Sequence, residues 1–206
     1  PEIAMLLADA VGKTKVGKYK DFSMTKDERY ELYVAAWLHD CGKIATPTHI
    51  VDKATKLETI TDRIELVNTR FEVIKRDYEI SKLKQYIKII ESKSIDRTID
   101  NLESEYISDI EKLNKDKYFI NKCNIGSEFM DVVDQKRVEM IGNYKWMFDE
   151  EEMPLLSKKD IQSLQIPKGT LLPEERKIIN EHIITTIEML EQLPYPKTLK
   201  NVPAFA

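Results

Sequence analysis

The feature that most constrains the fold is a long stretch in which apolar residues recur every three or four positions. The first run contains Ile64, Val67, Phe71, Ile74 and Tyr78, and it continues with Leu83, Ile87 and Ile90. A second run follows the polar segment 92–96 and contains Ile99, Leu102, Tyr106, Ile110 and Leu113. This spacing places side chains on one face of an α-helix. We therefore predict two amphipathic helices, each about 40 Å long at roughly 1.5 Å per residue, paired as an antiparallel hairpin.

Composition favours a helical protein over the other common classes. Of the 206 residues, 33% are charged and 42% are apolar, and only 6 are glycine, which is untypical of disordered chains and of turn-rich β proteins. The net charge of −4 argues against a general nucleic-acid-binding surface. No apolar run approaches the roughly 20 residues that span a bilayer. Because Cys41 and Cys123 do not make a disulfide framework, we expect a cytoplasmic location.

A short motif, His39-Asp-Cys-Gly-Lys43, follows the apolar run 33–38. Adjacent His and Asp residues are costly on a buried helix face unless they are paired or bound to a metal. Side chains of neighbouring helical residues point about 100° apart, so His39 and Asp40 can address one metal ion. Lys43 adds a compact cation that suits a phosphate-bearing substrate beside a metal. The alternatives are a hydrogen-bonded His–Asp core pair and a lysine exposed to solvent.

The helix that leads to this motif has a recognisable start. Thr25-x-x-Glu28 is a capping-box pattern, and we predict a helix from there to the His–Asp pair, with an end at Thr46-Pro47. One side of this helix contains Leu32, Ala35, Ala36, His39 and Asp40. We therefore expect the His–Asp pair to face the core, and we interpret the nearby Tyr33 and Trp37 as core aromatics.

A third histidine lies near the C-terminal end of the sequence. We predict a helix from Glu128 to about Met147 and, after a linker at 165–169, a further helix that Pro173 opens and that contains His182. One face of the latter helix contains Ile179, His182, Thr186, Met189 and Leu193. His182 is therefore expected to point inward, as a metal ligand or as a satisfied core histidine.

Two stretches resemble a known family. Ala36-Trp-Leu-His-Asp-Cys-Gly-Lys-Ile-Ala-Thr-Pro47 and Val51-Asp-Lys-Ala-Thr-Lys-Leu57 are similar to the centre of the HD superfamily of metal-dependent phosphohydrolases. Pro167-Lys-Gly-Thr-Leu-Leu-Pro-Glu-Glu-Arg-Lys-Ile-Ile-Asn-Glu-His182, with Leu193-Pro-Tyr-Pro196 after it, resembles the HD-GYP branch, whose members hydrolyse cyclic di-GMP. The resemblance implies an all-α fold with an HD-domain helical core. Its parts would be residues 1–60 and 167–206, with an inserted helical hairpin at 61–122 and connecting helices at 123–166.

The same resemblance implies a metal-binding catalytic site. His39, Asp40 and His182 would be metal ligands, with Asp40 bridging two ions and each histidine serving one. Asp40 and Lys43 would be the catalytic residues, and Lys43 would also bind substrate phosphate. Mixed imidazole and carboxylate ligation suits iron or manganese. The reaction implied is hydrolysis of a cyclic dinucleotide, or of another phosphate ester, by metal-activated water.

The sequence departs from the family pattern at two places. No counterpart of the family's first metal ligand, a His or Glu on an upstream helix, precedes His39. The His-His-Glu and Gly-Tyr-Pro elements, expected shortly after Ala206, are also missing. We therefore expect a fragment that does not hydrolyse cyclic di-GMP by itself. The alternatives are a non-catalytic HD scaffold that signals or forms a homodimer through the hairpin, and an HD hydrolase of another nucleotide phosphate.

Overall fold

The computed structural model describes residues 1–91 and 98–206 and divides the chain into two compact units. Unit 1 comprises residues 1–51 and 173–206, and unit 2 comprises residues 52–172. The regular structure is helical except for a small two-stranded sheet, so the predicted all-α class is confirmed. The polar segment predicted at 92–96 lies outside the described residues. Within the described ranges, no helix combines the length and the apolar character that crossing a bilayer requires.

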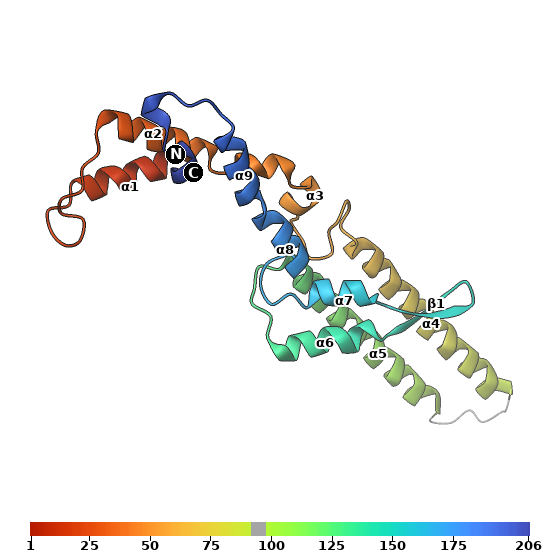
Figure 1. Ribbon diagram of the computed structural model, residues 1–206. Coiled ribbons are helices and arrows are strands. Elements are labelled where there is room, and N and C mark those ends of the chain that lie inside the picture. Colours follow the sequence, from red (N-terminus) through yellow and green to blue (C-terminus); the bar gives the residue numbers. More distant parts are fainter. Residues whose placement is uncertain (92–97) are drawn as a thin grey trace. The chain divides into compact units, whose positions relative to one another are not determined.

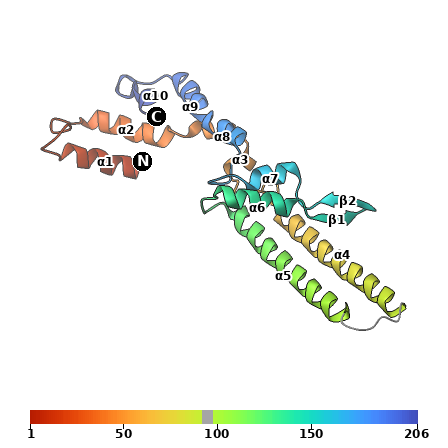
Figure 2. The same ribbon diagram turned by 90° about the horizontal axis from the view of Figure 1, so that it is seen from below.

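Two long helices dominate unit 2. They are α4 (Ile64–Glu91) and α5 (Thr98–Ile125), each 28 residues long, and they lie side by side in both views (Figure 1, Figure 2). Asn68 near the start of α4 exchanges amide hydrogen bonds with Asn121 near the end of α5. Further along, the Lys117 ammonium donates to the Glu72 carboxylate at 2.8 Å. The helices therefore run antiparallel, as the repeating apolar residues predict.

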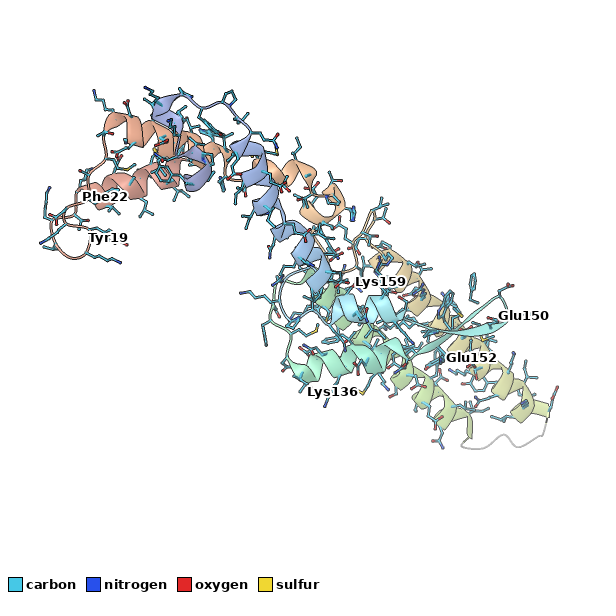
Figure 3. The ribbon with its side chains drawn as sticks, in the orientation of Figure 1. Tyr19, Phe22, Lys136, Glu150, Glu152 and Lys159 are labelled. Carbon is cyan, nitrogen blue, oxygen red and sulfur yellow. The ribbon has the colours of Figure 1, made fainter. Side chains whose placement is uncertain are left out.

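The rest of unit 2 contains the only strands among the described residues. Its elements are α6 (Val132–Gly142), β1 (Lys145–Phe148), β2 (Glu151–Pro154) and α7 (Lys158–Leu164). The helix predicted over 128–147 is therefore too long at both ends. Asp131 caps α6 by accepting from the Asp134 amide at 2.8 Å, and β1 pairs antiparallel with β2. The hairpin turn consists of Asp149 and Glu150, whose φ angles of 51° and 66° match the twist of a two-residue turn, and Figure 3 shows Glu150 at its tip.

Unit 2 encloses a continuous apolar core. Its buried members are Leu57, Val67, Phe71, Ile74, Leu113, Ile120, Met130, Val138, Ile141, Leu155, Leu156 and Leu164. A buried lysine closes one end of α7, because the Lys56 ammonium donates to the carbonyls of Leu164 and Ile166 at 3.0 and 2.7 Å. The same burial lowers the pKa of Lys56. The packed apolar core and the hydrogen bonds from Lys56 to the carbonyls at the end of α7 both stabilise unit 2.

Unit 1 consists of shorter helices. They are α1 (Glu2–Gly12), α2 (Lys26–Leu38), the 3₁₀ turns η1 (Cys41–Ala45) and η2 (Lys197–Leu199), α3 (Thr48–Val51), α8 (Pro173–Asn180), α9 (His182–Glu191) and α10 (Val202–Phe205). The predicted capping box is confirmed, because the Glu28 amide donates to Thr25 Oγ1 and the Thr25 amide donates to the Glu28 carboxylate. Figure 3 shows Tyr19 and Phe22 in the segment that joins α1 to α2.

Two predicted helix boundaries in unit 1 are wrong. The helix that Thr25 opens ends at Leu38, before the His–Asp pair, and the chain continues as η1 rather than as an α-helix to Thr46. The helix that begins at Pro173 is broken at Glu181 into α8 and α9. At this break the His182 imidazole bonds the Ile179 carbonyl, and such side-chain insertion into a helical ladder is a recognised cause of kinks.

The core of unit 1 is small. Its buried apolar residues are Met5, Ala35, Ile50, Leu190 and Val202. Tyr33 and Trp37 are 39% and 63% exposed, so their interpretation as core aromatics is wrong: the buried residues of α2 are Glu31 and Ala35. A buried polar contact adds to the packing, because the Asn201 amide donates to the Glu31 carboxylate at 2.6 Å. That contact joins α2 to the start of α10.

Candidate functional site

The His–Asp motif lies where α2 gives way to η1. His39 is the C-cap of α2, and Asp40 directly precedes the 3₁₀ turn. The turn packs against the first residues of α9, and Gly42 is the residue that permits this approach. A Cβ atom at position 42 would overlap the His182 carbonyl oxygen and would lie 2.5 Å from the Thr186 amide nitrogen. A glycine at this position therefore lets two segments far apart in the sequence meet.

The structure brings together all four residues that the sequence nominates. His182 Nε2 lies 3.2 Å from Asp40 Oδ1, although 142 residues (182 − 40) separate them. His39 Nε2 lies 3.2 Å from the other oxygen, Asp40 Oδ2. Lys43 Nζ donates to the same Oδ2 at 2.7 Å. Asp40 is therefore the centre of the cluster, with an imidazole on each of its two carboxylate oxygens.

Backbone carbonyls fix the orientation of both histidine rings. His39 Nδ1 bonds the Ala36 carbonyl at 3.0 Å, and His182 Nδ1 bonds the Ile179 carbonyl. Because a carbonyl oxygen only accepts, Nδ1 carries the proton in each ring, and Nε2 is the atom that faces Asp40. In a neutral imidazole this Nε2 presents a lone pair to a carboxylate oxygen, which is unfavourable unless a proton or a metal ion lies between them. Metal-ligating histidines are commonly oriented through such a bond from their other nitrogen.

The spacing of the donor atoms fits one ion per carboxylate oxygen. Two atoms that bind one ion at about 2.1–2.3 Å lie roughly 3.0–3.7 Å apart in tetrahedral or octahedral geometry, and each Nε2–Oδ separation is 3.2 Å. The two imidazoles approach different oxygens, so each position has two protein donors. Residues 1–91 and 98–206 contain no group of three or more His, Cys, Asp or Glu side chains that could hold a metal ion, so neither position has a third ligand of these types.

The cluster is partly open to solvent. The His182 side chain is 14% exposed and that of His39 is 55% exposed. The expectation that the His–Asp pair faces the core is therefore wrong. The His39 ring lies at the surface and the Asp40 side chain is 38% exposed, because α2 ends at Leu38, before both residues. On the His182 face of α9, Thr186 and Leu190 are buried, whereas Met189 and Leu193, which were expected there, are exposed.

The electrostatic surroundings keep Asp40 ionised. The hydrogen bond from Lys43 is the largest cause of its lowered pKa. Burial works against this lowering of the Asp40 pKa, and the charge of the Lys43 ammonium adds to it. An ionised carboxylate is the form that binds a metal ion. Asp40 is thus available as a metal ligand throughout the neutral pH range.

Thr186 also contributes to the site, although the sequence indicated only that it shares a helix face with His182. Thr186 Oγ1 accepts the backbone N–H of Gly42 at 2.9 Å, in a buried contact that joins η1 to α9. Its position four residues after His182 was visible in the sequence. Its partner lies 144 residues away, and only the folded chain reveals it.

Comparison with known proteins covers one part of this site. A family model described as an HD domain matches residues 159–206, which include α8, α9 and His182 but not the His39–Lys43 motif. Searches of curated proteins and of solved structures gave no match. The family match lies over the second of the two stretches that resemble HD proteins. It supports a relationship of this part of the chain to the HD superfamily.

Proposed function

We propose that His39, Asp40 and His182 hold divalent metal ions in a hydrolase that cleaves phosphate esters. The observation that carries the proposal is the arrangement around Asp40. Each of its oxygens faces an Nε2 atom whose ring is fixed by a backbone carbonyl. This arrangement presents lone pairs of three side chains toward the same small region, and a cation relieves their repulsion.

The three ligands divide between two positions. Asp40 Oδ1 and His182 would hold one ion, and Asp40 Oδ2 and His39 would hold a second, which is the bridging role expected of this aspartate. The mixture of imidazole and carboxylate suits iron or manganese. When bound, such ions neutralise the charge of a phosphate ester and supply hydroxide near neutral pH. The Ala36 and Ile179 carbonyls orient the two imidazoles, and the hydrogen bond from Lys43 keeps Asp40 deprotonated.

Lys43 is the residue we assign to the substrate phosphate. Its ammonium carries three donors, of which Asp40 Oδ2 takes one. The side chain is 41% exposed, so the remaining donors are accessible to an anion beside the carboxylate. A metal ion on Oδ2 competes with this lysine for the same oxygen. We infer that metal binding frees Lys43 to contact phosphate.

For the substrate we propose a cyclic dinucleotide, cyclic di-GMP. The support is the resemblance of the segment from Pro167 to His182 to the HD-GYP branch. The HD domain match covers the whole of that segment and supports the broader superfamily alone. Other phosphate esters share the same reacting group. A comparison of cyclic di-GMP with another phosphate ester as substrate therefore tests this choice.

A second candidate function is a non-catalytic HD scaffold that forms a homodimer through the hairpin. One outward stripe of α4 favours it, because Ile80, Leu83, Ile87 and Ile90 recur at spacings of three and four and are all about half exposed. Such a seam is typical of helices that associate. Sedimentation of the wild type and of Ile87→Glu separates this candidate from the first. A monomeric wild type contradicts it, and a dimer that the variant disrupts supports it.

The metal site of the proposed function is tested by Mn²⁺ binding, followed by electron paramagnetic resonance (EPR). Asp40→Asn removes the central charge with little change in shape, and we expect Mn²⁺ binding to be lost. Asp9→Asn is the matched control, because Asp9 is also a half-exposed carboxylate of unit 1 paired with a basic residue, Arg29 at 2.8 Å. It should bind as the wild type does. Absence of Mn²⁺ binding by the wild type, or equal loss in both variants, would overturn the metal site.

A further inference from the structure

The contact between η1 and α9 includes a buried hydrogen bond and a close backbone approach. The Gly42 N–H donates to Thr186 Oγ1 at 2.9 Å, and Thr186 is only 1% exposed. Gly42 is also buried, with no room for a Cβ atom against α9. Thr186 is therefore the side chain through which α9 holds the turn that follows Asp40.

Both residues of this contact are close in sequence to a residue of the candidate site. Asp40 is two residues before Gly42, at the start of the 3₁₀ turn. His182 is four residues before Thr186, which is about one turn of the same α-helix. Both connecting segments are short and hydrogen-bonded. A shift between Gly42 and Thr186 must therefore change the separation between Asp40 Oδ1 and His182 Nε2, now 3.2 Å.

We propose that Thr186 is a positioning residue that fixes Asp40 at the distance from His182 at which one cation contacts both. The inference rests on the proposed metal site and extends it to a residue that touches neither metal nor substrate. Threonine suits the role because its branched side chain has few rotamers and its hydroxyl oxygen accepts. Valine fills a similar volume but leaves the buried Gly42 N–H without an acceptor, so that the turn must move to satisfy it.

The neighbouring threonine provides a matched control. Thr185 Oγ1 bonds the Glu181 carbonyl of the preceding turn at 3.5 Å, so that its hydroxyl serves its own helix. Replacing Thr185 by valine removes the same hydroxyl group as replacing Thr186 by valine, and both residues lie in α9. Of the two threonine hydroxyls, that of Thr186 bonds a residue of η1 and that of Thr185 does not. The comparison of Thr186→Val with Thr185→Val therefore isolates the connection from the loss of a helical threonine.

The experiment measures the Mn²⁺ dissociation constant of the 206-residue chain and its variants by EPR titration, with thermal unfolding by circular dichroism as the check on folding. We expect Thr186→Val to raise Kd about tenfold, the lower end of the loss found when residues that support metal ligands are replaced. Thr185→Val should leave Kd unchanged. Thr186→Ser, which keeps the hydroxyl, should bind nearly as the wild type does.

The outcomes separate this inference from the proposed function. Equal Kd values for the two valine variants would overturn the positioning role alone, because the metal site would then exist without it. Absence of Mn²⁺ binding by the wild type would overturn the metal site and the positioning role together. Should Thr186→Val fail to fold, the pair Thr186→Ser and Thr186→Ala differs only in the hydroxyl. Equal Kd values in that pair would also overturn the role.

Discussion

Unit 2 encloses a continuous cluster of aliphatic and aromatic side chains, whereas unit 1 buries few apolar residues and relies more on polar contacts between its short helices. In unit 1, Glu31 holds the start of α10 and Thr186 holds η1. Large apolar side chains such as Ile44, which is 84% exposed, remain at its surface. The candidate site therefore lies in the unit with the smaller core.

The difference indicates where each unit is sensitive. Burial of apolar area contributes most of the stability of a packed domain, so unit 2 should respond chiefly to changes of volume in its core. Unit 1 should respond to loss of individual buried hydrogen bonds and close contacts, because fewer apolar contacts compensate for them. Ligand-binding segments of proteins often lie in regions of low local stability.

The largest expected effect concerns the core of unit 2. Phe71 is fully buried, and Phe71→Ala should lower the free energy of unfolding by about 3–5 kcal/mol through lost burial and a cavity. Ile44→Ala in unit 1 should change it by less than about 0.5 kcal/mol. Urea unfolding can be followed unit by unit, because Trp146 lies in unit 2 and Trp37 in unit 1, and each can be observed with the other replaced by phenylalanine. Similar shifts for the two alanine variants would remove the contrast between the units.

A smaller effect is expected at the contact between η1 and α9. Gly42→Ala should destabilise unit 1 by about 1–3 kcal/mol, because its Cβ overlaps the His182 carbonyl and α9 must move. Mn²⁺ affinity should fall at the same time. Gly12→Ala is the matched glycine control, since nothing lies within 4 Å of a Cβ atom there. A Gly42→Ala protein with wild-type stability would show that the two segments are not in close contact.

Lys43 offers a third comparison, between two charged residues of one cluster. Lys43→Ala should weaken inorganic phosphate binding to the Mn²⁺-loaded protein several-fold. It should not lower the Mn²⁺ content at saturating Mn²⁺, because the ammonium contacts the anion and competes with the metal for Asp40 Oδ2. Asp40→Ala should lose Mn²⁺ and phosphate binding together. Calorimetric titration with phosphate measures phosphate binding, and EPR measures bound Mn²⁺. Equal loss of Mn²⁺ in the two variants would contradict the separate roles of the two residues.

The smallest effect concerns the pH dependence of stability in the helical hairpin of α4 and α5. Hydrogen bonds from Lys117 and Lys75 lower the pKa of Glu72 from 4.5 to about 2, against the effect of burial. A lowered carboxyl pKa stabilises the folded state above pH 4.5, and this contribution is lost as the pH falls toward 2. Because Glu72 is half exposed, solvent screening limits the contribution to less than about 1 kcal/mol. Glu72→Gln should flatten this part of the stability profile of unit 2, and an unchanged slope would count against the bridge between α4 and α5.

Much of the fold could be predicted from local sequence patterns. The apolar spacing of α4 and α5 and the capping box at Thr25 act over a few residues, and the structure contains both. The hairpin at Asp149 and Glu150 was missed because it has neither glycine nor asparagine at its left-handed positions. The break at Glu181 follows from a side-chain bond of His182 to the backbone, which helical spacing does not show.

For the candidate site too, the sequence predicted some features and missed others. His39, Asp40, Lys43 and His182 were nominated from their chemistry and from a family resemblance, and the structure brings them together. Their burial could not be predicted, because the exposure of His39 depends on where α2 ends. The role of Thr186 depends on a contact across 144 residues.

The most direct test of the metal site is a crystal soaked in Mn²⁺ and measured for anomalous scattering. The account predicts a peak between His182 Nε2 and Asp40 Oδ1, at about 2.1–2.3 Å from each atom, with a second peak on the Oδ2 side at higher Mn²⁺ concentration. In crystals of Asp40→Asn, both peaks should vanish. A strong Mn²⁺ peak elsewhere in unit 1, with none beside Asp40, would contradict the central claim.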